Sequence, residues 1–290
     1  MKLSSVLTIA GSDPSGGAGI QGDLKTIAAL GGFGMSVITA LTAQNTLGVH
    51  GIHDVPTEFV EAQFDAVARD IGVDAAKTGM LAGSEVIRTV AGRIRRYGIE
   101  KLVVDPVMVA KGGARLIREE AKKTLVAELV PLAFVLTPNI PEAEVLSGIP
   151  IKGIADMKEA ARIIRGMGAR HVVVKGGHLS GDAVDLLYDG CEFREFASPR
   201  IATDDTHGTG CTYSAAIATA LALGKDVAGA VTLAKRYITE AVRYAWRLGG
   251  GHGPTNHLAP LFAGGDGATV WPDWVEIERP GEGSWRIRPR

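Results

Sequence analysis

The stretch Asp205-Thr206-His207-Gly208-Thr209-Gly210-Cys211-Thr212 leads directly into an apolar, alanine-rich segment over residues 213–223. Alanine and leucine favour helix, so this composition predicts a helix beginning near Thr209. The first turn of a helix carries unpaired backbone N–H groups and the positive end of the helix dipole, which together favour a bound anion such as phosphate. Cys211 lies in the same turn, where a thiolate would also be favoured. A phosphate site with a reactive group beside it suggests phosphoryl transfer.

Upstream of this stretch, short β-branched runs alternate with longer segments of helical spacing. The runs lack polar alternation and are predicted to be buried strands, over residues 6–9, 36–39, 102–104, 134–136 and 171–174. Helices are expected over residues 59–71, 86–97, 118–129, 156–167, 209–223 and 226–247. Asp189-Gly190 separates two further apolar runs and predicts a hairpin over residues 183–196. The alternation predicts an α/β fold, a three-layer sandwich whose central, mostly parallel sheet has helices on both faces.

Polar and small residues follow several of the predicted strands directly. They include Gly11, Asp105, Asn139 and Lys175. The carboxyl ends of parallel strands form the ligand crevice in open α/β sheets. We therefore expect a site built from several strand ends.

The stretch from Asp205 to Cys211 resembles the anion-hole motif of the ribokinase superfamily, usually Asp-Thr-x-Gly-Ala-Gly-Asp, with Cys211 at the last position. This replacement resembles one branch, the hydroxymethylpyrimidine/phosphomethylpyrimidine kinases of thiamine biosynthesis. The similarity extends roughly over residues 5–262 and includes further motifs at residues 10–23, 43–46, 77–80, 105–107 and 137–139. It implies a ribokinase-like kinase domain over residues 1–262. It also implies ATP-dependent phosphorylation of 4-amino-5-hydroxymethyl-2-methylpyrimidine, a small pyrimidine alcohol, and of its monophosphate.

The resemblance also implies which residues bind the pyrimidine. These are Gly11, Asp23, Gln44, Met80, Val107 and His207. A Gln44 amide can pair with both the donor amine and the acceptor nitrogen of an aminopyrimidine, and a Met80 thioether suits an aromatic face. Four of these residues also have a simpler interpretation: Asp23 as a solvated helix residue, Gln44 as a loop residue, Met80 as core filler, and His207 as a loop histidine with a satisfied hydrogen bond.

The phosphate side of the predicted site involves ATP and Mg²⁺. Lys175 leaves a predicted strand beside glycines and could reach a phosphate as a point charge. The resemblance assigns nucleotide binding to Asn139, Lys175, Thr209 and Gly210, and it assigns organisation of Mg²⁺ to Glu142. Asp105 is a second oxygen donor for Mg²⁺, which needs only one or two carboxylates besides ATP phosphates. Asn139 could instead cap the following helix, and capping does not exclude the metal role.

Cys211 is the candidate base that takes the alcohol proton, since in relatives an Asp at this position does so. A helix N-terminus can lower a thiol pKa, so a thiolate could act near neutral pH, with the Gly208, Thr209 and Gly210 amides holding the developing charge. Catalytic roles are accordingly predicted for Cys211, Lys175, Gly208 and Gly210. The alternative is a small buried residue that packs a helix start.

Composition limits the other possibilities. The chain has 290 residues and a formal net charge of −1, which gives no electrostatic case for nucleic acid or an anionic membrane. No apolar run approaches the roughly 20 residues that span a bilayer. Two cysteines form no disulfide framework, so we expect a cytoplasmic protein, and the apolar start is interpreted as a core strand rather than a signal peptide.

The last residues, 263–290, lie outside the resemblance and contain three of the four tryptophans, Trp271, Trp274 and Trp285. We expect this extension to pack on the kinase domain or on a partner subunit. A homodimer is expected.

Rival functions differ in class. A pyridoxal kinase shares the fold and in some branches the cysteine, but Gln44 and Met80 favour the pyrimidine. A regulatory protein could bind the pyrimidine without turnover, although a sensor would not need Asn139, Glu142 and Lys175. A dinucleotide-dependent oxidoreductase is excluded because the first strand–helix turn has no Gly-x-Gly-x-x-Gly fingerprint.

Overall fold

The computed structural model describes residues 3–108, 119–259, 275–281 and 284–289. An eight-stranded sheet of order β10-β9-β8-β7-β6-β5-β1-β2 forms the centre. Its strands are β1 Ser5–Ala10, β2 Phe33–Ile38, β5 Ala75–Thr78, β6 Leu102–Val104, β7 Val135–Leu136, β8 His171–Val174, β9 Ala183–Tyr188 and β10 Phe193–Ser198. Neighbours from β2 to β8 pair in parallel, whereas β9 and β10 are antiparallel additions at one edge.

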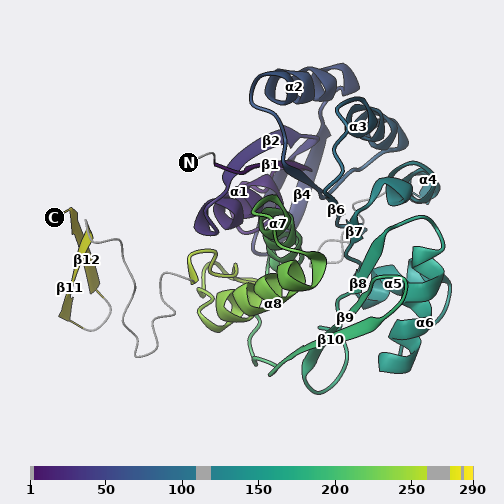
Figure 1. The fold of residues 1–290 in the computed structure, drawn as a ribbon. Coiled ribbons are helices and arrows are strands. Elements are labelled where there is room, and N and C mark those ends of the chain that lie inside the picture. Colours follow the sequence, from purple (N-terminus) through teal and green to yellow (C-terminus); the bar gives the residue numbers. More distant parts are fainter. Residues whose placement is uncertain (1–2, 109–118, 260–274, 282–283, 290) are drawn as a thin grey trace.

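Helices cover both faces of this sheet (Figure 1). They are α1 Gly19–Ala29, α2 Thr57–Asp70, α3 Ser84–Arg96, α4 Glu119–Thr124, α5 Ile140–Ser147, α6 Ile154–Arg165, α7 Thr209–Ala222 and α8 Val227–Arg243. After α4 the chain continues as a π turn, Leu125–Leu129, and a 3₁₀ turn, Val130–Leu132.

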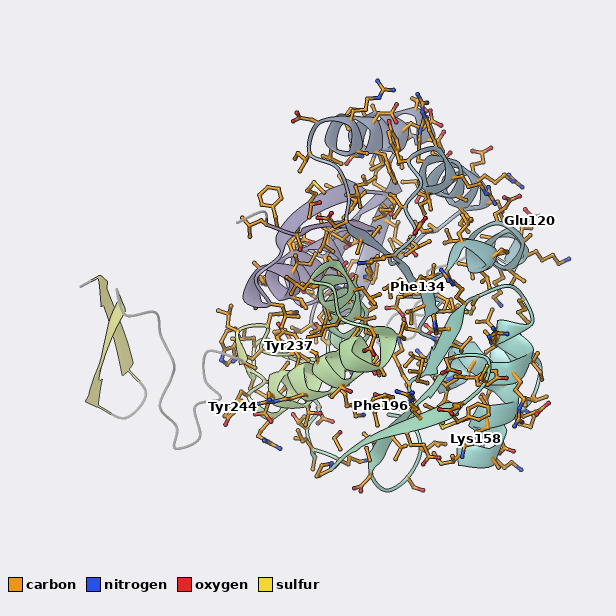
Figure 2. The ribbon with its side chains drawn as sticks, viewed as in Figure 1. Glu120, Phe134, Lys158, Phe196, Tyr237 and Tyr244 are labelled. Carbon is orange, nitrogen blue, oxygen red and sulfur yellow. The ribbon has the colours of Figure 1, made fainter. Side chains whose placement is uncertain are left out.

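Successive residues of the central strands point to opposite faces and so build two cores. Leu102 and Val104 of β6 pack with α2, α3 and α6, whereas Val103 packs with α7 and α8. Tyr237 of α8, labelled in Figure 2, belongs to the second core. The three-layer α/β fold predicted from the sequence is confirmed, and the start of the chain forms a fully buried strand, β1.

Two strand elements of the fold were not predicted. β5 was missed because Ala75-Ala76-Lys77-Thr78 is not a β-branched apolar run. A separate two-stranded sheet, β3 Ala40–Asn45 and β4 Gly48–Asp54, was also missed, and it places Gln44 in a strand rather than in a loop.

In the C-terminal extension, β11 Val275–Gly281 and β12 Ser284–Pro289 pair as an antiparallel hairpin. The predicted boundary between residues 262 and 263, Trp271, Trp274 and the side chain of Trp285 all lie outside the described residues. Packing of the extension against the kinase domain or a partner therefore stays a prediction. Within the described part of the chain, no helix combines the length and the apolar character needed to cross a membrane.

Candidate active site

A cavity of about 750 Å³ opens at the carboxyl ends of the parallel strands. This volume suits a small-molecule site. Every site residue predicted from the sequence lines the cavity except Asp23. The group predicted to face the pyrimidine is Gly11, Gln44, Met80, Val107 and His207, and the group predicted to face the phosphates is Asp105, Asn139, Glu142, Lys175, Gly208, Thr209, Gly210 and Cys211.

The start of α7 is held against the loop that follows β1. Gly208 precedes the helix with φ +81°, in the left-handed region that favours glycine, and a Cβ there would overlap the carbonyl oxygen of Gly17. A Cβ on Gly210 would lie 3.4 Å from Lys175 Nζ and 3.6 Å from Asp105 Oδ2. The glycines therefore let the helix N-terminus approach a lysine and a carboxylate closely.

Lys175 and Asp105 form an ion pair at the wall of the cavity. Lys175 Nζ lies 2.8 Å from Asp105 Oδ1, and the Ser214 hydroxyl donates to Asp105 Oδ2 at 3.2 Å. Burial alone would lower the pKa of Lys175, but the charges of Asp105 and Glu142 outweigh it and raise that pKa. The lysine is therefore a fixed positive charge beside the first turn of α7.

Asn139 and Glu142 form a reciprocal cap at the start of α5. The Glu142 amide donates to Asn139 Oδ1 at 2.9 Å, and the Asn139 amide donates to Glu142 Oε2 at 2.9 Å. The capping interpretation of Asn139 is thus confirmed. Burial, reinforced by Asp105 and opposed by Lys175, raises the pKa of Glu142 to about 7. A cation beside these two carboxylates would favour their ionised forms, so the residues fit Mg²⁺.

Cys211 lies at the cavity wall, but its thiol is not activated as predicted. Burial among protein atoms raises its pKa to about 11, and the nearby Lys77 ammonium offsets only part of this rise. The expectation of a lowered pKa at the helix start is wrong in this structure, because loss of water around the thiolate outweighs the favourable charges. At neutral pH the side chain is a thiol.

Asp23 lies beneath the cavity rather than in its wall. Its carboxylate is fully buried and receives hydrogen bonds from Lys77 Nζ at 2.8 and 3.0 Å and from the Thr8 hydroxyl at 2.5 Å. The prediction that Asp23 contacts the pyrimidine directly is therefore not supported by this geometry. Asp23 instead holds Lys77, whose charge acts on Cys211.

Asp13 lines the cavity, although the sequence had assigned it no role in the site. Its buried carboxylate accepts hydrogen bonds from the Ser15 and Ala18 amides and faces His207 Nε2 at 2.7 Å. Burial raises the pKa of Asp13, but His207 and the other donors outweigh it and lower the pKa to about 2. The carboxylate is therefore ionised and fixes the proton of His207 on Nε2. Its place directly after the first predicted strand, within the motif at residues 10–23, was a signal, and Ser15 two residues later is typical of an Asx turn.

Gln44 and Met80 both line the cavity, Gln44 beside His207 and Met80 beside Gly11. Gln44 Nε2 lies 3.4 Å from His207 Nε2, and since that ring nitrogen faces Asp13, the Gln44 amide keeps donors for a ligand. Met80 packs against Gly11, where a Cβ would overlap the Met80 methyl group. An amide and a thioether thus flank the space beside the Gly11 loop.

The cavity wall contains a second ion pair, also missed from the sequence. Lys235 Nζ of α8 lies 2.9 Å from Asp185 Oδ2 of β9, and Asp185 Oδ1 accepts from the Gly176 amide at 3.0 Å. Asp185 therefore fixes the backbone next to Lys175. Ile238 and Thr239, one turn further along α8, continue this wall.

Comparisons with known proteins agree with this geometry. The family model for phosphomethylpyrimidine kinase matches residues 13–256. The chain is 58% identical over 255 residues to the thiamine biosynthesis bifunctional protein ThiED of Geobacter sulfurreducens, covering 88% of this chain but only 52% of that longer relative. It is 50% identical to the hydroxymethylpyrimidine/phosphomethylpyrimidine kinase of Bacillus subtilis, covering 89% of this chain and 96% of the relative.

Solved structures of related vitamin kinases have the same fold. The ADP complex of Bacillus subtilis pyridoxal kinase superposes with a TM-score of 0.84 at 42% identity, covering 89% of this chain and 98% of that one. The phosphomethylpyrimidine kinase of Clostridium difficile superposes with a TM-score of 0.75 at 47% identity, covering 83% of this chain and 100% of that one. The chain belongs to the phosphomethylpyrimidine kinase family.

Proposed function

We propose that this protein phosphorylates the hydroxymethyl group of 4-amino-5-hydroxymethyl-2-methylpyrimidine with ATP, and then the resulting monophosphate, as a step of thiamine biosynthesis. One observation carries the proposal. The fixed charge of Lys175, the start of α7 and the Asp105 carboxylate meet at the wall of one cavity, which Gln44 and Met80 also line. This arrangement suits a phosphate beside a small aromatic alcohol.

Each residue has a defined role in this proposal. Gln44 orients the aminopyrimidine and Met80 contacts its face, while the alcohol oxygen attacks the γ-phosphorus of ATP and ADP departs. The amides of residues 208–210 and the Lys175 ammonium stabilise the transferring group. Because Cys211 is a thiol at neutral pH, it does not take the hydroxyl proton; the proton passes to an oxygen of the transferring phosphoryl group, and most of the catalysis comes from positioning and charge stabilisation. Asp23 acts indirectly, by holding Lys77.

Mg²⁺ would be held by Asp105 and Glu142 together with ATP. When bound, the ion supplies neutralisation of charge on the phosphates. Lys175 attracts both carboxylates toward the part of the cavity proposed to hold the ATP phosphates. It contacts Asp105 directly, and its charge also acts on Glu142.

A pyridoxal kinase is the second candidate, and it is favoured by the structural likeness to pyridoxal kinases. Steady-state ADP release with each alcohol separates the two. We expect a higher kcat/KM for the aminopyrimidine than for pyridoxal, and the reverse order would favour the second candidate. Binding of the pyrimidine without any ADP release would indicate a regulatory protein instead.

We also propose a cytoplasmic homodimer. Leu41, Leu47 and Ile52 of the β3–β4 sheet and its turn are exposed, and a second copy would cover them. Sedimentation equilibrium of the full chain tests this, with a Leu47→Asp variant expected to sediment as a monomer.

Truncation after residue 262 tests whether the C-terminal extension packs on the kinase domain or on a partner subunit. An unchanged melting temperature and oligomer size would contradict this predicted packing.

A further inference from the structure

We propose that residues 251–257, termed here the strap, position the pyrimidine-binding wall of the cavity, with Gly251 as the critical positioning residue. The sequence Gly251-His252-Gly253-Pro254-Thr255-Asn256-His257 follows α8 and contacts several loops that surround the site. The strap connects three parts of the site by hydrogen bonds and close packing: the β3–β4 turn, His207 and the loop after β1. The inference rests on the proposed function, because it assigns Gln44 to the pyrimidine.

The first tie holds the turn between β3 and β4. The His252 amide donates to the Thr46 carbonyl oxygen at 3.0 Å, and the Gly251 amide donates to Thr46 Oγ1 at 3.3 Å. Thr46 is two residues beyond Gln44 in the sequence. A Cβ on Gly251 would overlap the Thr46 carbonyl oxygen and lie 3.0 Å from the Cα of Leu47. The two backbones therefore pack so closely that only a glycine fits.

The second tie holds His207. Its amide donates to the Gly253 carbonyl oxygen at 3.0 Å, and its own carbonyl oxygen accepts from the Thr255 amide at 3.2 Å. The Gly253 amide in turn donates to Asp205 Oδ1 at 3.1 Å. The strap thus pairs with His207 on both sides, as a short parallel bridge.

The third tie reaches the loop after β1 and anchors the strap. A Cβ on Gly17, in that loop, would lie 3.0 Å from Pro254 Cβ. A Cβ on Gly22, in the first turn of α1, would lie 3.2 Å from His257 Nε2, so the buried imidazole packs against the start of α1. The Tyr237 hydroxyl donates to the His257 carbonyl oxygen, and the Asn256 amide donates to the Ala241 carbonyl oxygen. Both anchors belong to α8, where Figure 2 labels Tyr237.

These ties fix the relation between Gln44 and His207. The two side chains come from different elements, β3 and the residues before α7, and their nitrogens lie 3.4 Å apart. Both elements bond to adjacent residues of the strap. A displacement of the Thr46 turn relative to the strap would therefore move Gln44 away from His207 and away from a ligand bound between them.

Gly251→Ala, with Gly250→Ala as its matched control, tests the inference. A Cβ on Gly250 would meet only Leu47 Cδ2, at an ordinary 3.7 Å, and neither glycine has a positive φ. We expect Gly251→Ala to raise KM for the pyrimidine about tenfold or more, with KM for ATP changed less than about twofold. Gly250→Ala should match the wild type in both constants.

A second variant keeps the test decisive if Gly251→Ala does not fold. Thr46→Val removes the hydroxyl that accepts from Gly251 but leaves the carbonyl bond to His252. It should raise KM for the pyrimidine about threefold, without a change for ATP. Equal constants for the two glycine variants, or equal rises of both KM values, would overturn the inference. If the wild type does not accept the pyrimidine, the proposed function is wrong, and the same variants are then compared on the alcohol that it phosphorylates.

Discussion

Lys175 Nζ and Asp105 Oδ1 lie 2.8 Å apart and join the ends of β8 and β6, two strands separated in the sheet by β7. Each side chain leaves its strand at the carboxyl end, which is why residues 70 positions apart meet. The pair keeps a positive charge beside the first turn of α7 even though burial opposes it.

Replacing Lys175 by Met should remove the charge that stabilises the transferring phosphoryl group. We expect kcat to fall by about 100-fold or more, the usual loss for one preorganised electrostatic contact, with a smaller change in KM for the pyrimidine. Steady-state kinetics measure both constants. Lys158→Met, which removes a partly exposed lysine paired with Glu195, is the control and should leave kcat unchanged. A Lys175→Met variant with kcat within tenfold of the wild type would contradict the assignment.

The raised pKa of Cys211 predicts a slow-reacting thiol. With a pKa of about 11, only about 10⁻⁴ of the side chain is thiolate at pH 7, so alkylation should be about a hundredfold slower than for an ordinary free cysteine. Intact-mass measurement of iodoacetamide labelling checks this in a Cys191→Ser protein, which keeps Cys211 as its one cysteine. The rate should rise about tenfold per pH unit up to at least pH 9. A rate that levels off near pH 7 would show a low-pKa thiolate.

Gly208→Ala should be strongly destabilising, because the residue has a φ of +81° and a Cβ would overlap the Gly17 carbonyl oxygen. The expected loss of unfolding free energy is about 2 kcal/mol or more. Gly92 in the exposed part of α3 is the contrast, since nothing lies within 4 Å of a Cβ there. Gly92→Ala should stabilise the protein by up to about 1 kcal/mol. Urea unfolding of both variants gives the comparison, and equal stabilities would disprove it.

His257 predicts a dependence of stability on pH. Burial lowers its pKa from 6.5 to about 4, so between these values the unfolded chain binds more protons than the folded chain. The free energy of unfolding is therefore highest above pH 6.5 as far as His257 is concerned. It falls by up to about 3 kcal/mol as the pH decreases toward 4. Chemical unfolding at several pH values between 4 and 7 measures this loss.

The control for this experiment is His257→Asn, which cannot titrate. Glu142 acts in the opposite direction, because its pKa is raised to about 7 and its folded form binds the extra proton. The unfolding free energy of the wild type therefore combines two opposite dependences on pH. The difference between the wild type and His257→Asn gives the dependence that is due to His257 alone. Parallel curves for the two proteins would contradict the burial of a neutral imidazole.

Local sequence patterns predicted the sheet and most of the cavity wall. The β-branched runs ending at Val104 and Val174 place Asp105 and Lys175 at strand ends, so topology alone brings them to one edge. β5 was not predicted because it contains Lys77, and a lysine usually indicates an exposed position. Lys77 is buried here because Asp23 of α1 pairs with its charge, and the sequence alone does not show this pairing.

Properties that depend on burial and on distant partners could not be predicted. Cys211 begins a helix as expected, but the local sequence does not reveal how far the thiol is desolvated, which reversed the direction of its pKa shift. Asp13 and His207 are 194 positions apart, and no local pattern links them. The predicted roles of Asp23 and Cys211 changed for the same reason: the surroundings, rather than the residue types, determine their chemistry.

A crystal structure with Mg²⁺, a non-hydrolysable ATP analogue and the aminopyrimidine alcohol tests the central claim most directly. We expect the γ-phosphate to lie within hydrogen-bonding distance of the backbone amides of residues 208–211 and of Lys175 Nζ, with the alcohol oxygen in line and the ring against Gln44. A γ-phosphate seated away from α7, or a pyrimidine bound outside the wall formed by Gln44 and Met80, would contradict it.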